Sequence, residues 1–170
     1  EAKPVFQKWL HDVDLTVLDA VFGAVFAHRL QGDPVWLFVV GPPGDGKTEC
    51  LRSMFGHPEI FDLTTLTPTT LISGLDGKGK DPSLLPKLDG KVLVIKDFTA
   101  ILDMMSESRQ EVLGTLRDAY DGEAAKAFGT GEVRAYHSRF GLVAAVTPAI
   151  DRYWSVISQL GERFIRVRMT

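Results

Sequence analysis

Short apolar runs alternate with amphipathic stretches along most of this chain. The runs at 35–40, 92–95 and 142–146 consist wholly of apolar residues and are followed by glycine, lysine or threonine. Runs of this length and composition predict strands that are buried on both faces of a parallel sheet. The stretch 60–63 is predicted as a further strand. Residues 164–169, where apolar residues alternate with arginine, predict a strand with one wet face.

Helices are predicted where apolar residues recur at helical spacing between these runs. They are one from Asp14, as N-cap, to about Leu30, one over 47–55, a short one from about Thr69, and one with a capping box of Ser108 and Glu111 that ends near Gly122. Residues 1–13 are predicted as a loosely packed lead-in, 74–82 as a loop, and 125–140 as a β-hairpin.

This alternation of helices and strands predicts an α/β fold with a doubly wound parallel sheet. At 170 residues the chain is long enough to bury one full core, so we expect a single domain. Within it, 1–34 form the lead-in and first helix, and 35–170 form the core.

The first apolar run leads directly into Gly41, Pro42, Pro43, Gly44, Asp45, Gly46, Lys47 and Thr48. This segment matches G-x-x-x-x-G-K-[ST], the phosphate-loop motif of P-loop NTPases, at every fixed position. Its glycines allow successive backbone N–H groups to turn toward phosphate oxygens. We expect Lys47 to reach the β- and γ-phosphates and the Thr48 hydroxyl to bind Mg²⁺. The segment and the adjoining Glu49 therefore form a predicted nucleoside triphosphate site.

Composition limits the other possibilities. The net charge of −3 gives no basic footprint over the whole chain, and the single cysteine, Cys50, excludes an internal disulfide. Because the chain contains no Asn, it lacks the usual Asn-Lys-x-Asp guanine reader, which favours ATP as the nucleotide. No apolar run approaches the about 18 residues that cross a bilayer, and no signal peptide is present, so we expect a cytoplasmic protein.

A phosphate loop requires an acidic partner on a neighbouring strand to hold Mg²⁺ and orient the attacking water. The candidate is the apolar run followed by Lys96, Asp97 and Phe98, which departs from the usual Asp-Glu ending. If the usual Asp-Glu pair is aligned with Lys96 and Asp97, Lys96 takes the position of the metal-binding Asp and Asp97 that of the catalytic Glu. If the alignment is shifted by one residue, Asp97 binds the metal and Phe98 takes the position of the catalytic Glu. Strand alternation places Lys96 and Asp97 on opposite faces, and we assign the acid to Asp97. If it serves only the metal, Glu123 or Asp62 orients the water, or turnover is slow.

Four segments in this order resemble the AAA+ ATPases: the phosphate loop, Val92–Asp97, Ala144-Ala145-Val146-Thr147-Pro148 and Gly161-Glu162-Arg163-Phe164. The order is most similar to the branch that holds the minichromosome-maintenance helicases and the ATPases of phages and mobile elements. The resemblance extends over 35–169 and implies the large subdomain of that family. The family's helical lid, which would follow Met169, is not present in this chain.

The resemblance implies roles for two further residues. Thr147 falls on the sensor-1 position, which contacts the γ-phosphate or the attacking water, and Arg163 falls on the arginine finger, which reaches the nucleotide of an adjacent subunit. With Lys47 and Asp97 they are the candidate catalytic residues, and Thr48 and Asp97 are the candidate metal ligands. Alternatively, Thr147 ends a strand, and Arg163 is a solvated charge or a salt-bridge partner.

Two predicted loops resemble polymer-handling loops of the same family. They offer cations to DNA phosphates at Lys78 and Lys80 in the first loop, and at Lys126, Arg134, His137 and Arg139 in the second. Both are alternatively ordinary exposed loops.

These features together predict a motor domain that binds and hydrolyses ATP and assembles into a hexameric ring. It would act on DNA as a helicase or translocase of a phage or mobile element, without contact to a membrane. Two alternatives remain open. One is a nucleotide-gated assembly module with weak hydrolysis, which the Lys96-Asp97 pair favours. The other is a small-molecule phosphotransferase whose pocket comes from the loop at 74–90.

Overall fold

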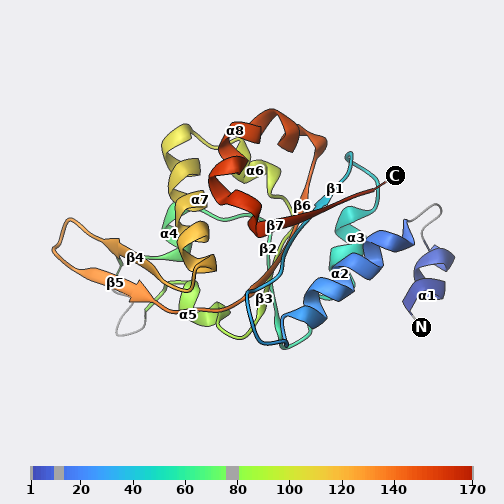
Figure 1. The fold of residues 1–170 in the computed structure, drawn as a ribbon, viewed down its shortest axis with the longest axis horizontal. Helices are drawn as coiled ribbons and strands as arrows, with labels where there is room; N and C mark the ends of the chain where they lie inside the picture. The colour runs from blue at the N-terminus through green and yellow to red at the C-terminus, as the bar shows by residue number, and fades with distance from the viewer. Residues whose placement is uncertain (1, 10–13, 76–80, 170) are drawn as a thin grey trace.

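A parallel sheet of five strands forms the centre of the molecule, in the order β2-β3-β6-β1-β7 (Figure 1). The structure is a computed structural model that describes residues 2–9, 14–75 and 81–169. Its strands are β1 (Trp36–Val40), β2 (Ile60–Leu63), β3 (Val92–Ile95), β6 (Gly141–Val146) and β7 (Phe164–Arg168). All the predicted strands are present, with bounds within one residue of those expected.

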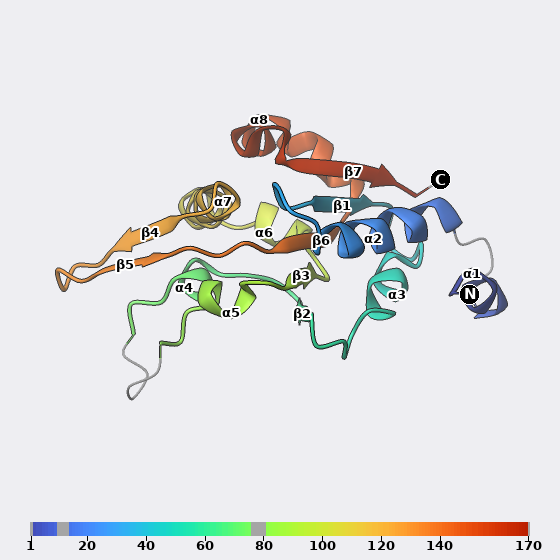
Figure 2. The same ribbon diagram turned by 60° about the horizontal axis from the view of Figure 1, so that its bottom comes forward.

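Helices cover both faces of this sheet (Figures 1 and 2). Trp36, Phe38 and Val40 of β1 enter one hydrophobic core, while Leu37 and Val39 enter a second core on the other face. This division follows from the pleat, which turns successive side chains to opposite faces. The doubly covered parallel sheet confirms the predicted α/β architecture.

Different helices cover the two faces of the sheet. One is covered by α2 (Leu15–Ala27) and α3 (Lys47–Arg52). The other is covered by α4 (Pro68–Leu71), α5 (Leu85–Leu88), α6 (Thr99–Leu102), α7 (Ser106–Tyr120) and α8 (Trp154–Ile157), with the 3-10 helices η1 (Pro148–Tyr153) and η2 (Ser158–Arg163). Asp14 caps α2 as predicted, since its carboxylate accepts a hydrogen bond of 2.9 Å from the Thr16 amide.

Three expectations about local structure were wrong or incomplete. Within the predicted lead-in, Ala2–Trp9 form a helix, α1. The proposed capping box fails because α7 already begins at Ser106, which places Ser108 and Glu111 inside the helix. The short helices α5 and α6 and the helical segment 148–163 were not predicted, because runs of four to six residues carry too little periodicity to be recognised.

The predicted hairpin is present as β4 (Ala124–Ala127) and β5 (Val133–Tyr136), paired antiparallel. Gly131 in its turn has a φ of 86°, a conformation that favours glycine. The hairpin projects from the body beyond α7 (Figure 2). In the part of the chain that the structure describes, no helix is both long and apolar enough to span a membrane.

Candidate nucleotide-binding site

The phosphate-loop segment connects β1 to α3 at the carboxyl edge of the sheet. Gly44 and Gly46 have φ values of 93° and 77°, which L residues rarely adopt. A Cβ on Gly41 would lie 3.1 Å from the Met169 Cβ and 3.3 Å from the Lys47 Cδ, so a side chain there would crowd its neighbours. All three glycines are therefore required by the shape of the loop.

Several backbone amides of this loop have no partner within the described chain. The amides of Gly44, Gly46, Lys47 and Thr48 form no hydrogen bond to any described residue, in part because the first amides of a helix have no intrahelical acceptor. The same residues, with Glu49, line a cavity of about 200 Å³. Unpaired amides around a cavity are suited to bind the oxygens of an anion.

Lys47 lies beside this cavity and is only 8% exposed. Its ammonium group donates hydrogen bonds of 2.5 Å to the carbonyl oxygens of Gly41 and Pro42. Burial lowers the pKa of Lys47 below its ordinary value, and the negative charges of Asp45 and Asp97 oppose this effect. A buried cation with only neutral acceptors is poised to take an anionic partner, because a phosphate would compensate its lost hydration better.

Asp97 follows β3 at the same edge of the sheet, two strands away from β1 with β6 between them. Its side chain is exposed, and one carboxylate oxygen accepts a hydrogen bond of 3.3 Å from the Ala100 amide at the start of α6. The negative charge of Asp97 contributes to the pKa of Lys47, so the two charges are close enough to interact. The assignment of the acidic partner to Asp97 stays a prediction.

Lys96 points to the other face of the sheet. Its ammonium group forms an ion pair of 3.0 Å with Asp62 of β2 and lies 4.6 Å from the centre of the Phe55 ring, which follows α3. Asp62, one of the two candidates to orient water, thus already forms an ion pair with Lys96. The other, Glu123, precedes β4 and lies 4.0 Å from His137 of the hairpin.

Phe98 occupies the position where the usual motif has glutamate in the shifted register. It is fully buried, with its ring centre 4.7 Å from that of Phe38 in the core. The chain therefore presents one acid, Asp97, where the usual motif has two.

Thr147 follows β6 and so lies between the phosphate loop and Asp97 along the edge of the sheet. Its amide donates a hydrogen bond of 3.0 Å to the Thr99 hydroxyl, which in turn donates one of 3.2 Å to the Thr147 hydroxyl. Sequence reasoning missed Thr99. The signal in the sequence that could have indicated it was a hydroxyl residue two positions after Asp97. Thr99 is the first residue of α6.

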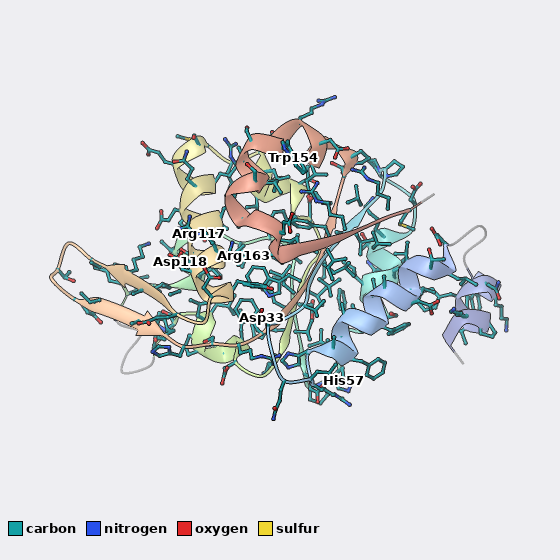
Figure 3. All side chains as sticks on the ribbon, in the orientation of Figure 1. Asp33, His57, Arg117, Asp118, Trp154 and Arg163 are labelled. Atoms are coloured by element: carbon teal, nitrogen blue, oxygen red, sulfur yellow. The ribbon has the colours of Figure 1, made fainter. Side chains whose placement is uncertain are left out.

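Arg163 precedes β7 and lies at the opposite edge of the sheet from the phosphate loop. Phe164 aligns with Trp36 at the start of β1, so the length of a strand, roughly 16 Å, separates Arg163 from the loop. Its guanidinium donates to both carboxylate oxygens of Asp121, at 2.7 and 2.8 Å, and lies 5.4 Å from the centre of the Tyr120 ring. Figure 3 shows Arg163 beside the end of α7. Within one chain, Arg163 cannot reach the phosphate-loop segment.

The cations proposed to contact DNA are engaged within the chain where the structure describes them. Lys126 pairs with Glu111, Arg134 pairs with Glu132 at 2.6 Å and His137 lies 4.0 Å from Glu123. Arg139 donates three hydrogen bonds, of 3.0, 2.7 and 2.7 Å, to the carbonyl oxygens of His28, Leu30 and Gly32. Lys78 and Lys80 lie outside the described residues.

No protein-family model matches this chain, and no curated protein matches its sequence. The fold and the arrangement of the site therefore indicate only a broad class of protein. They describe an α/β domain with a parallel sheet, compatible with a Rossmann-like or P-loop fold.

Among the described residues, no group of three His, Cys, Asp or Glu side chains could hold a metal ion. Thr48 and Asp97 would bind Mg²⁺ only together with phosphate oxygens and water, as is usual for this ion.

Proposed function

We propose that this chain is the ATP-binding domain of an AAA+-type ATPase, with its nucleotide site at the carboxyl edge of the sheet. The observation that carries the proposal is the loop after β1, where unpaired amides and the buried ammonium of Lys47 surround a cavity. The charge of Asp97 acts on the same ammonium group. Ligands of open α/β sheets bind at the carboxyl ends of the strands. An anion at this cavity would satisfy both the amides and Lys47.

In this proposal each polar residue has a defined task. Lys47 exchanges the carbonyls of Gly41 and Pro42 for the β- and γ-phosphate oxygens. Thr48 and Asp97 hold Mg²⁺, whose charge stabilises the negative charge that develops on the transferred phosphoryl group. The Thr147 hydroxyl, held by Thr99, is placed to contact the γ-phosphate or the attacking water.

The position of Arg163 supports a proposal of assembly. Because Arg163 lies a strand's length from its own phosphate loop, it can serve as an arginine finger only at the nucleotide of another copy. We propose a ring, by resemblance a hexamer, that acts on DNA as the motor of a phage or mobile element. Contacts with DNA would fall to the loop around Lys78 and Lys80 and to the hairpin, whose cations would have to leave their present partners.

A second candidate function is favoured by one observation. Phe98, fully buried beside Phe38, leaves the end of β3 with a single acid. A site with a metal-side acid and no second carboxylate binds ATP but orients water poorly. The chain would then be a nucleotide-gated assembly module that hydrolyses ATP slowly.

Calorimetric titration with ATP and Mg²⁺ tests the proposal. Lys47→Ala should weaken ATP binding at least about tenfold, because a charge-assisted contact to the phosphates is lost. Lys91→Ala is the matched control, since Lys91 precedes β3 at the other edge of the sheet. Thermal unfolding of both variants checks that they fold. Equal ATP affinity of wild type and Lys47→Ala would refute the site.

Gel filtration and turnover then separate the two candidate functions. Both predict growth of the particle on addition of ATP and Mg²⁺. The motor also requires turnover that falls when Arg163 is replaced by alanine and that recovers in part when Arg163→Ala and Asp97→Asn chains are mixed. Growth without measurable turnover would support the assembly module.

A further inference from the structure

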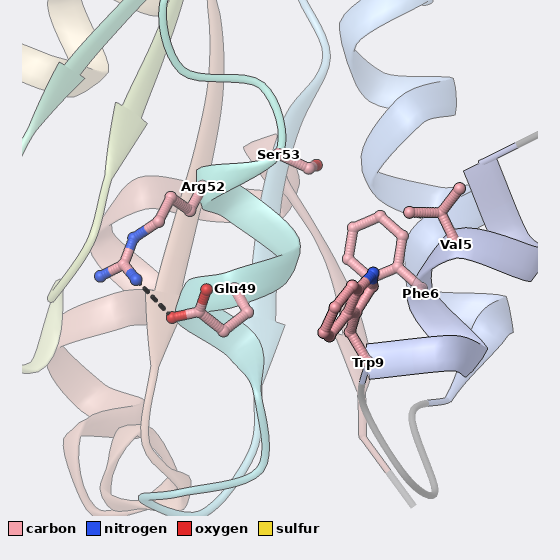
Figure 4. Close-up of a pocket in the computed structure, with 6 residues that line it drawn as sticks. All are labelled: Val5, Phe6, Trp9, Glu49, Arg52 and Ser53. Atoms are coloured by element: carbon pink, nitrogen blue, oxygen red, sulfur yellow. Dashed lines mark hydrogen bonds and ion pairs between the residues drawn. The ribbon is translucent and has the colours of Figure 1, made fainter.

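A second cavity adjoins the phosphate loop. It has a volume of about 350 Å³ and lies between α1 and α3, with a lining of Val5, Phe6, Trp9, Glu49, Arg52 and Ser53. Figure 4 shows the rings of Phe6 and Trp9 pointing from α1 toward α3, while the carboxylate of Glu49 points toward Arg52. Glu49 also lines the cavity of the phosphate loop, so both cavities border the N-terminal part of α3. A single ligand could occupy both.

The α1 side of this cavity is apolar and largely exposed, and the ammonium group of Lys8 lies 5.3 Å from the centre of the Trp9 ring. Trp9 is 74% exposed and Val5 is 58% exposed, an unusual exposure for two large apolar side chains on one short helix. The polar contact that joins α1 to the body is an ion pair of 2.6 Å between Lys3 and Asp19 of α2. This exposed ion pair links α1 to α2 and leaves the aromatic face available to a ligand.

The α3 side of the cavity is polar. Arg52 forms an ion pair of 2.7 Å with one carboxylate oxygen of Glu49. The pairing offsets a negative charge that would otherwise repel phosphates bound at the neighbouring loop. A ligand that fits both cavities is therefore anionic where it meets the loop amides and flat and aromatic where it meets Phe6 and Trp9.

We propose that Phe6 and Trp9 form the base subsite, in which the base of the nucleotide stacks on the aromatic face of α1. This inference rests on the proposed nucleotide site and adds the residues that select the base. Aromatic side chains stack on any base, and a larger ring buries more surface. Purine nucleoside triphosphates should therefore bind more tightly than pyrimidine ones.

Comparison of ATP with inorganic tripolyphosphate, each with Mg²⁺, tests the base subsite by calorimetry. Tripolyphosphate fills the phosphate loop but has no base, so the ratio of the two affinities reports the subsite. Trp9→Ala should reduce this ratio about tenfold and leave tripolyphosphate binding unchanged. Trp9→Phe, which retains an aromatic ring, should preserve most of it.

Trp154→Ala is the matched control, since Trp154 of α8 is similarly exposed, at 61%, and lies on the other side of the sheet. It should leave the ratio unchanged. A second measurement is tryptophan fluorescence, which ATP should change in the wild type but not in Trp9→Phe.

The outcomes distinguish the two proposals. If tripolyphosphate binds and Lys47→Ala abolishes that binding, but Trp9→Ala leaves the ratio of affinities unchanged, the base subsite is refuted and the phosphate site stands. If the wild type binds neither ligand, both proposals fail.

Discussion

Replacement of Arg139 by alanine should destabilise the whole domain, whatever its effect on DNA. The guanidinium reaches from the end of the hairpin segment to the carbonyl oxygens of His28, Leu30 and Gly32, which follow α2. The carbonyl of His28, the C-cap residue of α2, has no intrahelical donor, and a cation there also interacts favourably with the helix dipole. Arg139 therefore joins the turn after α2 to the strand that enters the centre of the sheet.

The magnitude follows from the number and exposure of these bonds. A hydrogen bond contributes about 1 kcal/mol net, more with a charged donor, and those to Leu30 and Gly32 are exposed to water, which reduces their share. We therefore expect Arg139→Ala to lower the free energy of unfolding by about 2 kcal/mol. For a domain of this size that corresponds to a fall in Tm of roughly 4–8 °C. Arg139→Lys should recover less than half, since an ammonium group cannot serve three diverging acceptors.

Urea unfolding followed by circular dichroism measures this loss. The matched control is Arg152→Ala, because Arg152 is an exposed arginine of η1 with no hydrogen bond to a described residue. It should unfold within about 0.5 kcal/mol of the wild type. An Arg139→Ala chain that unfolds like the wild type but loses affinity for DNA would refute the structural role and restore Arg139 as a DNA contact.

Three further predictions concern the loop, the sheet edge and the hairpin. Gly46→Ala should lower the free energy of unfolding by about 1–2 kcal/mol in urea, because its φ of 77° is unfavourable for an L residue; no change would mean that the loop relaxes without cost. Thr99→Val should reduce ATP turnover more than stability, since the Thr99 hydroxyl holds Thr147; a loss confined to stability would contradict this role. Burial raises the pKa of Asp81, but hydrogen bonds, led by that from Tyr136, outweigh it and lower this pKa below 3.8. Asp81 therefore stabilises the fold above that pH and loses the effect as pH falls through its folded pKa, so the stability difference between wild type and Asp81→Asn should shrink below about pH 4. A difference that stays constant there would refute the assignment.

The conformation of the loop after β1 could be predicted from sequence because its requirements are local. Gly44 and Gly46 supply the left-handed conformations within the loop, and an apolar run of six residues before Gly41 makes the strand that carries it. The same holds for the buried strands, whose composition alone distinguishes them from the rest of the chain. The short helices α5 and α6 could not be predicted, because contacts with the sheet stabilise them rather than their own sequence.

The surroundings of the candidate acid could be predicted only in part. Strand alternation indicated that Lys96 and Asp97 face opposite ways, but not what each side chain contacts. The tertiary structure pairs Lys96 with Asp62 and the Phe55 ring, residues distant in the sequence, and leaves Asp97 exposed at the carboxyl edge of the sheet. Phe98 likewise reads as a substituted glutamate in the sequence and is a core residue in the fold.

The sequence by itself determined the α/β class, the strands and the glycine-rich loop after β1, since each depends on residues that are adjacent in the chain. Only the tertiary structure decided which charges are free to act. Arg134, Arg139 and Arg163 are equivalent as cations in the sequence, yet each is held by acceptors up to 111 residues away. The free energy of a charged side chain depends on the groups that fold against it, and those groups are fixed by the packing of the whole domain.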